Sequence, residues 1–153
     1  MAIAAAVVAV VVLVVVVVLE HGKKGPTVTP ISAPLDPYAA SLPITHLQMS
    51  ESGNLAGSKV TYVDGVLENT GNKTVTGASF QILFRNYAHE VVQNNTQPLK
   101  LIRTRVPYVD VETAASDPLK PGTSKEFRLA FDGVASGWDG AFPEIRIVQV
   151  ENK

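Results

Sequence analysis

The fold is decided by one stretch of the sequence, TVTGASFQILFRN, which occupies residues 74–86. Its even positions include Phe80, Ile82 and Phe84, whereas its odd positions include the polar Gln81 and Arg85. Successive side chains of a β-strand point to opposite faces, so an apolar residue at every second position indicates a strand with one apolar face. The stretch therefore predicts a half-buried strand whose phenylalanines point into a core.

The same alternation recurs on both sides of this stretch. Phe127, Leu129 and Phe131 alternate with more polar residues, and Ile145 alternates in the same way with its neighbours. Turn-forming residues separate the segments, as at residues 69–73, 121–122 and 132–133. Further strands are expected at residues 43–49, 59–68, 91–95, 99–105, 108–112, 127–131 and 145–148.

These short strands with frequent turns predict an all-β domain over residues 43–153. Seven or eight antiparallel strands of this length are typical of an immunoglobulin-like β-sandwich or a small barrel. About 110 residues are enough to bury a single core without cross-links. We expect the immunoglobulin-like antiparallel β-sandwich.

An uninterrupted apolar run precedes the domain. Residues 2–19 carry no charged or polar side chain, and most of them are valine. Eighteen residues in a helix span roughly 27 Å, close to the thickness of a bilayer core, and a lone segment in lipid must be helical. A cleavable signal peptide is the alternative, but the run lacks a preceding basic residue and a following small-x-small site. Residues 2–19 are therefore predicted to be one uncleaved transmembrane α-helix.

Proline marks the segment between the helix and the domain. Pro26, Pro30, Pro34 and Pro37 fall within residues 20–42, and proline disfavours both helices and central strands. Such a segment tends toward an extended, semi-rigid conformation. We expect residues 20–42 to be a Pro-rich tether; a lead-in packed on the domain is the alternative.

Two motifs carry a resemblance to a known class of domains. Residues 65–75, GVLENTGNKTV, resemble the G-x-V-x-N-x-G-x-x-x-V opening of FxLYD-type domains, which are related to the late-embryogenesis-abundant type 2 sandwiches. Residues 119–127 match a later L-x-P-G-x-x-x-x-F element, but ILFRN at residues 82–86 lacks the tyrosine of Phe-x-Leu-Tyr-Asp. The resemblance covers residues 44–150. It implies an immunoglobulin-like sandwich that commonly follows one N-terminal helix in bacteria and mostly has no assigned activity.

A second, narrower resemblance rests on two further segments. Residues 102–110 and 142–146 are similar to the "IRTRxPYVD" and "FPEIR" segments of a bacterial family of unknown function. This resemblance implies no activity.

Observations conflict over which side of the membrane the domain occupies. Lys23 and Lys24 follow the apolar run, and positive charge tends to stay in the cytoplasm. The tether and the resemblance favour the other side. We expect a single-pass protein of the inner (cytoplasmic) membrane whose domain is extracytoplasmic, although the positive-inside tendency disagrees.

The sequence offers little chemistry for catalysis. It has no cysteine, and its net charge of −1 does not suggest a nucleic-acid surface. His21, His46 and His89 are not spaced as metal ligands on one element, and no nucleophile elbow or phosphate loop occurs. Carboxylates such as Asp64 and Asp132 are interpreted as turn residues. We expect no enzyme activity, no cofactor, no metal site and no nucleic-acid partner.

Two features are candidates for contact with another protein. Lys100, Arg103 and Arg105 concentrate positive charge in one short predicted strand, where the arginines would share a face beside Tyr108. The alternative is an edge strand protected by its charges. Trp138 lies in a Gly-bounded loop, where it would either anchor a partner or cap the sandwich.

These observations predict a membrane-anchored, non-enzymatic binding or scaffolding module. Its partners would be the membrane, through the single helix, and another protein. The alternative function is an accessory structural subunit of a larger membrane protein complex, docked through its helix and its sandwich. Small residues at Ala4, Ala5, Ala6 and Ala9 would then let the helix pack closely against a neighbouring helix.

Overall fold

The computed structural model describes residues 32–53 and 57–153. Within these ranges no helix is both long and apolar enough to cross a membrane. The predicted transmembrane helix at residues 2–19, with its alanines Ala4, Ala5, Ala6 and Ala9, lies outside the described residues. So does the first part of the predicted tether.

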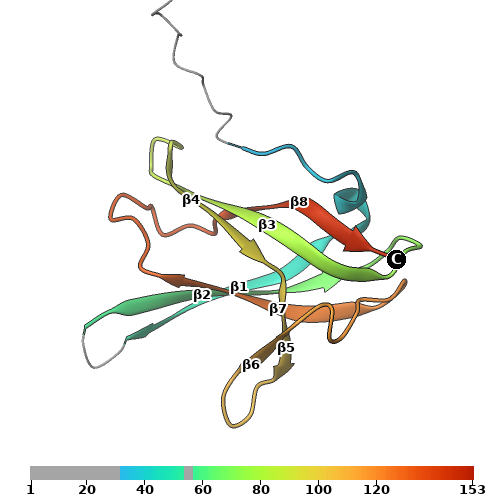
Figure 1. The fold of residues 1–153 in the computed structure, drawn as a ribbon. Coiled ribbons are helices and arrows are strands. Elements are labelled where there is room, and N and C mark those ends of the chain that lie inside the picture. Colours follow the sequence, from blue (N-terminus) through green and yellow to red (C-terminus); the bar gives the residue numbers. More distant parts are fainter. Residues whose placement is uncertain (1–31, 54–56) are drawn as a thin grey trace, which may run out of the picture. The chain divides into compact units, whose positions relative to one another are not determined.

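The described chain forms eight strands and one short 3-10 helix, η1 (Pro37–Ser41). The strands build two antiparallel sheets, one in the order β1-β2-β7-β5-β6 and the other in the order β4-β3-β8 (Figure 1). The expected all-β fold with two antiparallel sheets is therefore confirmed. The strands are β1 (Ile44–Gly53), β2 (Lys59–Glu68), β3 (Val75–Arg85), β4 (Val91–Pro98), β5 (Lys100–Thr104), β6 (Asp110–Thr113), β7 (Ser124–Asp132) and β8 (Glu144–Asn152).

The core lies between the two sheets and is centred on phenylalanines from β3 and β7. The rings of Phe80 and Phe127 are 5.3 Å apart between centroids, and those of Phe84 and Phe131 are 4.9 Å apart at an interplanar angle of 86°. Tilted and edge-to-face contacts of this kind are favoured by the ring quadrupoles. The inward register predicted for both strands is confirmed.

The outer face of β3 is also covered. Gln81 and Leu83 point away from the phenylalanine core, yet both are buried. The chain at the start of the described region crosses this face, and the backbone N–H of Ala33 donates to Oε1 of Gln81 over 2.8 Å. The sequence pattern predicts a half-buried strand, but this overlying segment buries the outer face of β3 in addition to the face that lies in the core.

Residues 32–42, called the lead-in below, also hold the edge of β8. The N–H of Asp36 donates to the carbonyl of Ile147 over 3.0 Å, and the Asp36 carboxylate accepts from the N–H of Val150 over 2.9 Å. Leu42 at the end of the lead-in is 2% exposed and belongs to the core. The described part of the predicted tether thus packs on the sandwich, as in the alternative considered for that segment.

The turn between β2 and β3 is organised by one buried side chain. Asn69 is fully buried, and its Nδ2 donates to the carbonyls of Lys73 (2.7 Å) and Leu119 (3.0 Å). Its Oδ1 accepts from the N–H of Gly71 over 3.1 Å. Because buried backbone carbonyls need partners, this asparagine fixes the hairpin and links it to the segment before β7.

Candidate interaction surface of the β5–β6 hairpin

The β5–β6 hairpin lies at one edge of the five-stranded sheet and extends away from the body of the domain (Figure 1). β5 pairs with β7 at Leu101, opposite Phe127, and pairs along its length with β6. Leu101 is buried in the core. The base of the hairpin is therefore part of the sandwich, whereas residues 105–109 form its outer end.

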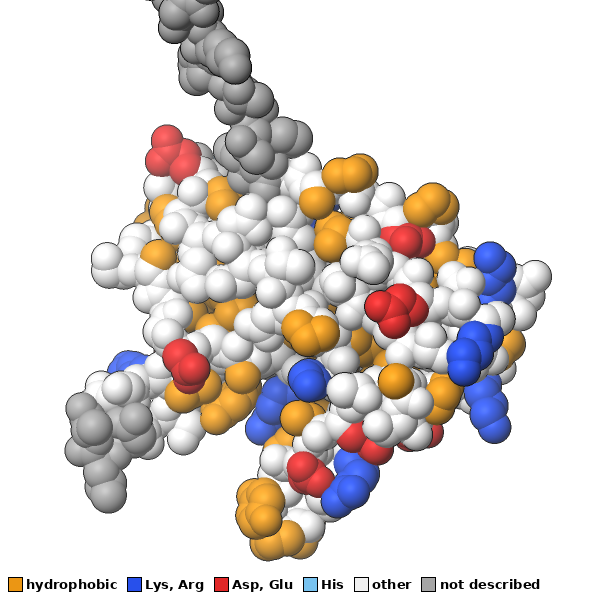
Figure 2. All heavy atoms as spheres, viewed as in Figure 1, with side chains coloured by type: hydrophobic (Ala, Val, Ile, Leu, Met, Phe, Trp, Pro, Cys, Tyr) orange, Lys and Arg blue, Asp and Glu red, His pale blue; other side chains and the backbone are white. Residues whose placement is uncertain are grey.

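The outer end of the hairpin, residues 106–108, carries exposed apolar side chains. Val106 is 80% exposed, Tyr108 is 74% exposed, and Pro107 between them is also exposed. Figure 2 shows a cluster of hydrophobic side chains at the end of this hairpin, with charged side chains beside it. We call residues 106–108 the hairpin tip.

Ion pairs brace the hairpin just behind its tip. Arg105 contacts two carboxylates, with Nη1 3.2 Å from Oδ2 of Asp64 and Nε 3.0 Å from Oε2 of Glu126. Arg103 pairs with Asp110 across the hairpin at 3.0 Å. The hydrogen bond to Glu126 is the main reason that the pKa of Arg105 is raised. These contacts tie the hairpin to β2 and β7.

Asp64 is the centre of the charge cluster on the outer face of the five-stranded sheet. It lies opposite Arg128 in the β2–β7 register, and Nε and Nη2 of Arg128 donate to its two oxygens over 2.7 Å and 2.8 Å. The Arg128 guanidinium also lies 4.6 Å from the centroid of the Tyr62 ring. Burial alone would raise the pKa of Asp64, but the hydrogen bonds from Arg128 and Arg105 hold it below its ordinary value.

The predicted cationic face is therefore an ion-paired one. Arg103 and Arg105 do not act as one free surface, because each has a carboxylate partner on a different element. The register between β5 and β6 shifts between Ile102 and Thr104, in the segment that carries Arg103. Lys100 lies in β5 opposite Thr113, and Tyr108 is at the exposed tip.

Trp138 packs on the sandwich. Its ring lies 5.4 Å from that of Phe84 at an interplanar angle of 86°, and its Nε1 donates to the carbonyl of Ala141 over 3.0 Å. The indole is thus occupied by contacts within the chain, as the capping alternative supposed.

Three residues that matter here have no distinctive signal in the sequence pattern. Asp64 was interpreted as a turn residue, but it lies in the middle of β2; Glu126 lies in β7, beside Arg128. Their partnership depends on the β2–β7 register, which one sequence does not reveal. Val106 could have been noticed as one of several apolar residues next to a proline in a predicted turn.

A second group of charged side chains lies at the other sheet. Nη2 of Arg85 is 2.7 Å from Oε2 of Glu144, and Nη1 of Arg146 is 3.1 Å from the other oxygen of the same carboxylate. The hydrogen bond from Arg85, followed by that from Arg146, lowers the pKa of Glu144. Ser32 and His89 line the hollow beside this group. Among the residues that the structure describes, no cluster of histidine and carboxylate side chains could hold a metal ion.

The fold and the hairpin define a small two-sheet β domain with an exposed apolar tip. The chain belongs to the DUF2393 family, which is described as a family of proteins of unknown function; the family model matches residues 39–144. Neither the curated proteins nor the solved structures contained a match to the chain.

Proposed function

We propose that the protein is a membrane-anchored, non-enzymatic binding module. An immunoglobulin-like sandwich on the extracytoplasmic side would bind a partner protein through the hairpin tip. The observation that carries this proposal is the tip itself, which exposes Val106 and Tyr108 on a hairpin braced by ion pairs.

The strand order supports an immunoglobulin-like sandwich of the FxLYD type. The order β1-β2-β7-β5 corresponds to strands A, B, E and D of an immunoglobulin domain, and β4-β3-β8 corresponds to C′, C and F. β6 is an addition beside D. In an immunoglobulin domain the last strand, G, lies beside F, which corresponds to β8. Here the lead-in lies along that edge of β8, where the N–H of Asp36 donates to the carbonyl of Ile147.

The chemistry of the tip favours a protein partner with an apolar pocket. Protein interfaces combine an apolar, often aromatic centre with a polar rim. Here Val106, Pro107 and Tyr108 form the apolar centre, and the exposed Arg103–Asp110 pair lies at the rim. Because Arg105 is held by two carboxylates, less conformational entropy would be lost on binding.

The anchor is supported by the apolar run at residues 2–19, and the extracytoplasmic side by the resemblance to FxLYD-type domains. Lys23 and Lys24 favour the opposite orientation. A cysteine at the exposed turn residue Asn72 decides between them, because the chain has no cysteine of its own. In intact cells, with any outer membrane permeabilised, an impermeant thiol reagent should label it. Labelling seen only after the inner membrane is lysed places the domain in the cytoplasm.

Photo-crosslinking in cells tests the role of the hairpin tip. A photoreactive phenylalanine analogue replaces Val106 or Tyr108, and exposed Asn72 is the matched control position. Both tip positions should give the same discrete adduct, and an added Arg105→Ala substitution should weaken it by loosening the hairpin. Equal adducts from the control position, or none from the tip, would contradict the proposal.

The alternative, an accessory subunit of a larger membrane complex, differs in stoichiometry. Extraction in mild detergent followed by purification of the full chain distinguishes the two. A partner recovered in a fixed ratio, held even when the tip carries Tyr108→Ser, indicates a subunit. A partner lost with that substitution indicates a binding module.

A further inference from the structure

Residues 32–53 and 57–153 form two sheets, whose edge strands are β1, β6, β4 and β8. An edge strand exposes backbone groups that can pair with another chain, and proteins block such edges with bulges, charges, short strands or covering segments. In β1 a bulge between Thr45 and Gln48 interrupts the pairing, and His46 inside it has a positive φ of 53°. The edge of β1 is therefore irregular.

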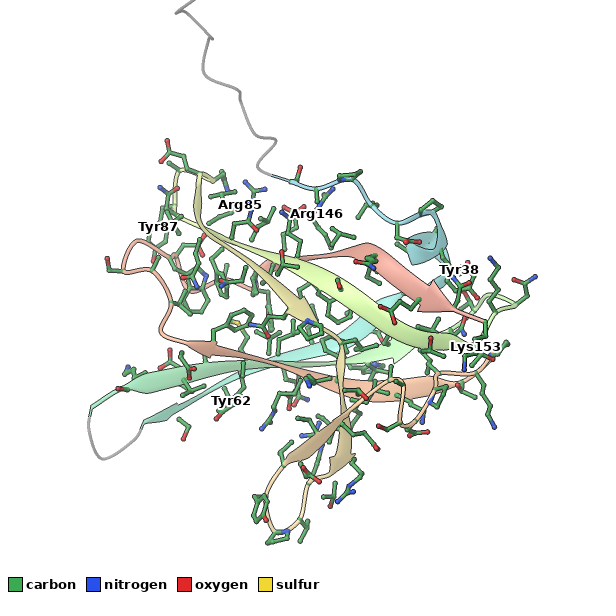
Figure 3. The ribbon with its side chains drawn as sticks, in the orientation of Figure 1. Tyr38, Tyr62, Arg85, Tyr87, Arg146 and Lys153 are labelled. Atoms are coloured by element: carbon green, nitrogen blue, oxygen red, sulfur yellow. The ribbon has the colours of Figure 1, made fainter. Side chains whose placement is uncertain are left out.

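The edges of β6 and β8 are blocked in other ways. β6 is four residues long and contains Asp110 and Glu112. The lead-in covers the edge of β8 through the hydrogen bonds of Asp36. Figure 3 shows Arg146 between β8 and the lead-in, and its Nη2 donates to the carbonyl of Ala33 over 3.0 Å. Neither of these edges is long, uncharged and uncovered.

β4 differs from the other three edge strands. It is eight residues long, and its sequence VVQNNTQP contains no charged side chain. Its pairing with β3 is irregular only at its first residues and is unbroken from Gln93 to Pro98. Figure 2 shows mostly white atoms, those of uncharged polar side chains and backbone, over β4. Of the edge strands in the described chain, β4 therefore has the fewest protections against further pairing.

Alternation shows which backbone groups of β4 point outward. The N–H of Leu99, directly after β4, donates to the carbonyl of Ala78 in β3 over 2.8 Å. Residues of an antiparallel strand direct their N–H and C=O groups to the two sides in turn, so those of Gln97 and Gln93 also face β3. Thr96 lies between these two glutamines at an even position. Its N–H and C=O therefore point away from β3, toward the edge of the sheet.

Two glutamine side chains hold β4 in place. Nε2 of Gln97 donates to the carbonyl of Ala130 in β7 over 2.8 Å, and Oε1 of Gln93 accepts from the N–H of Ala135 over 2.7 Å. These hydrogen bonds fix β4 to the five-stranded sheet and to the loop that follows β7. A strand held in this way loses little conformational entropy when a second strand pairs with it.

We propose that the edge of β4 pairs with β4 of a second copy of the chain, antiparallel and across a two-fold axis. A two-fold axis brings the same surface of both copies together, so a charged strand faces its own charges there. β4 has no charge to repel a copy of itself, and Thr96, exposed beside the axis, suits the threonine contacts that stabilise cross-strand pairs. The three-stranded sheet then continues into that of the second copy.

This contact goes beyond the proposed function, because it uses β4 and not the hairpin tip. A dimer carries two hairpin tips, and two linked sites hold a partner more tightly than one site when both can bind at once. Two strands of eight residues bury less surface than a standard stable interface, so we expect the dimer to dissociate on dilution.

Cysteine cross-linking of the full chain tests the pairing, because the chain has no cysteine of its own. Thr96→Cys lies on β4, and Ser50→Cys, at an exposed position of the edge strand β1, is the matched control. Each full-length variant is purified in mild detergent and treated with a short bis-maleimide at several protein concentrations. Thr96→Cys should give several-fold more covalent dimer than Ser50→Cys, and the difference should shrink on dilution.

Hydrogen exchange of the unsubstituted chain gives a second readout that needs no variant. Exchange at the N–H of Thr96 should slow as the protein concentration rises, because that N–H becomes paired. Thr96→Lys places like charges across the axis and should remove this dependence, whereas Ser50→Lys should keep it. Thermal unfolding confirms that each variant is folded.

Equal cross-linking at positions 50 and 96, no cross-linking at 96, or exchange at 96 that does not depend on concentration overturns the pairing of β4. Each of these results leaves the binding role of the hairpin tip standing, because that role is tested by photo-crosslinking at Val106 and Tyr108.

Discussion

The hydroxyl of Tyr38 lies 3.1 Å from Oδ1 of Asn69 and accepts from the N–H of Lys73 over 2.9 Å. The 3-10 helix of the lead-in is thereby joined to the turn between β2 and β3, although 31 residues separate the two side chains. A residue of the lead-in thus completes the hydrogen bonding of a fully buried asparagine.

Asn69→Ala should destabilise residues 32–153 by at least about 2 kcal/mol, because it removes the Nδ2 hydrogen bonds to the carbonyls of Lys73 and Leu119 and takes the acceptor from the N–H of Gly71. Urea unfolding measures the change. The exposed neighbour Asn72 is the control, and Asn72→Ala should stay within about 0.5 kcal/mol. Equal effects at the two positions would show that the buried contacts of Asn69 contribute little.

Gly65→Ala should destabilise the domain by about 1–3 kcal/mol, as overpacking of a core does. A Cβ at this position would lie 2.7 Å from Cζ of Phe127 and 2.9 Å from Cδ2 of Leu47. At Gly53 nothing lies within 4 Å, so Gly53→Ala should be neutral or slightly stabilising. Thermal unfolding of both variants gives the comparison, and a loss confined to Gly53 would contradict the packing of β2 against β7.

Phe80→Ala and Phe127→Ala should each cost about 3–5 kcal/mol, since each removes a large buried ring. Gln81→Ala, on the other face of β3, should cost about 1–2 kcal/mol, because the N–H of Ala33 loses its acceptor. Chemical unfolding of the three variants measures their losses of stability and so ranks them. If Gln81 were the most costly, the faces of β3 would have to be exchanged.

Asp64→Asn should cost about 3 kcal/mol at neutral pH, because it leaves the partly buried Arg128 without its carboxylate. The pKa of Asp64 is depressed in the folded state, so its contribution is present above the unfolded pKa and is lost as pH falls through the folded pKa. The wild-type chain should therefore lose stability below about pH 4, and the variant should lose less over that window.

Stability measured from neutral to acid pH checks both statements about Asp64. Asp132→Asn, at an exposed carboxylate, is the control and should change stability by no more than about 0.5 kcal/mol. An unchanged acid profile in Asp64→Asn would show that other carboxylates dominate the acid response.

Removal of the lead-in should weaken the sandwich. Residues 43–153 lack the core residue Leu42, the hydrogen bond from Ala33 to Gln81 and the hydrogen bonds of Asp36 to β8. They should therefore be at least about 3 kcal/mol less stable than residues 32–153. Both fragments should give β-type far-UV spectra and cooperative unfolding. Equal stability would show that the lead-in is not part of the folding unit.

The strands could be predicted because alternation is a local signal. All eight lie where period-two patterning or β-rich segments placed them, and the phenylalanines of β3 and β7 face inward as expected. Burial of Gln81 could not be predicted, because the segment that covers it lies 48 residues away in the chain. A proline-rich segment also has no alternation to show whether it packs or extends.

The candidate site was only partly visible in the sequence for a similar reason. Lys100, Arg103 and Arg105 drew attention as a run of charge, and Tyr108 as a nearby aromatic. The partners that neutralise the arginines come from β2, β6 and β7, so they are brought together by register and not by sequence distance. Val106 is exposed because β5 pairs with β7 at Leu101 and separates from it farther along the hairpin.

The lead-in has a mechanical consequence. A pull on the N-terminal side reaches the bonds of Ala33 to Gln81 and Arg146 first, and that of Asp36 to Ile147 next. Because these bonds follow one another along the pulled chain, they are loaded and broken one at a time, whereas the rows of bonds within each sheet share a load. The lead-in would peel off first and add roughly 35 Å of chain before either sheet is strained. Tension applied to the N-terminal side of the domain would lengthen the protein while the hairpin tip keeps its shape.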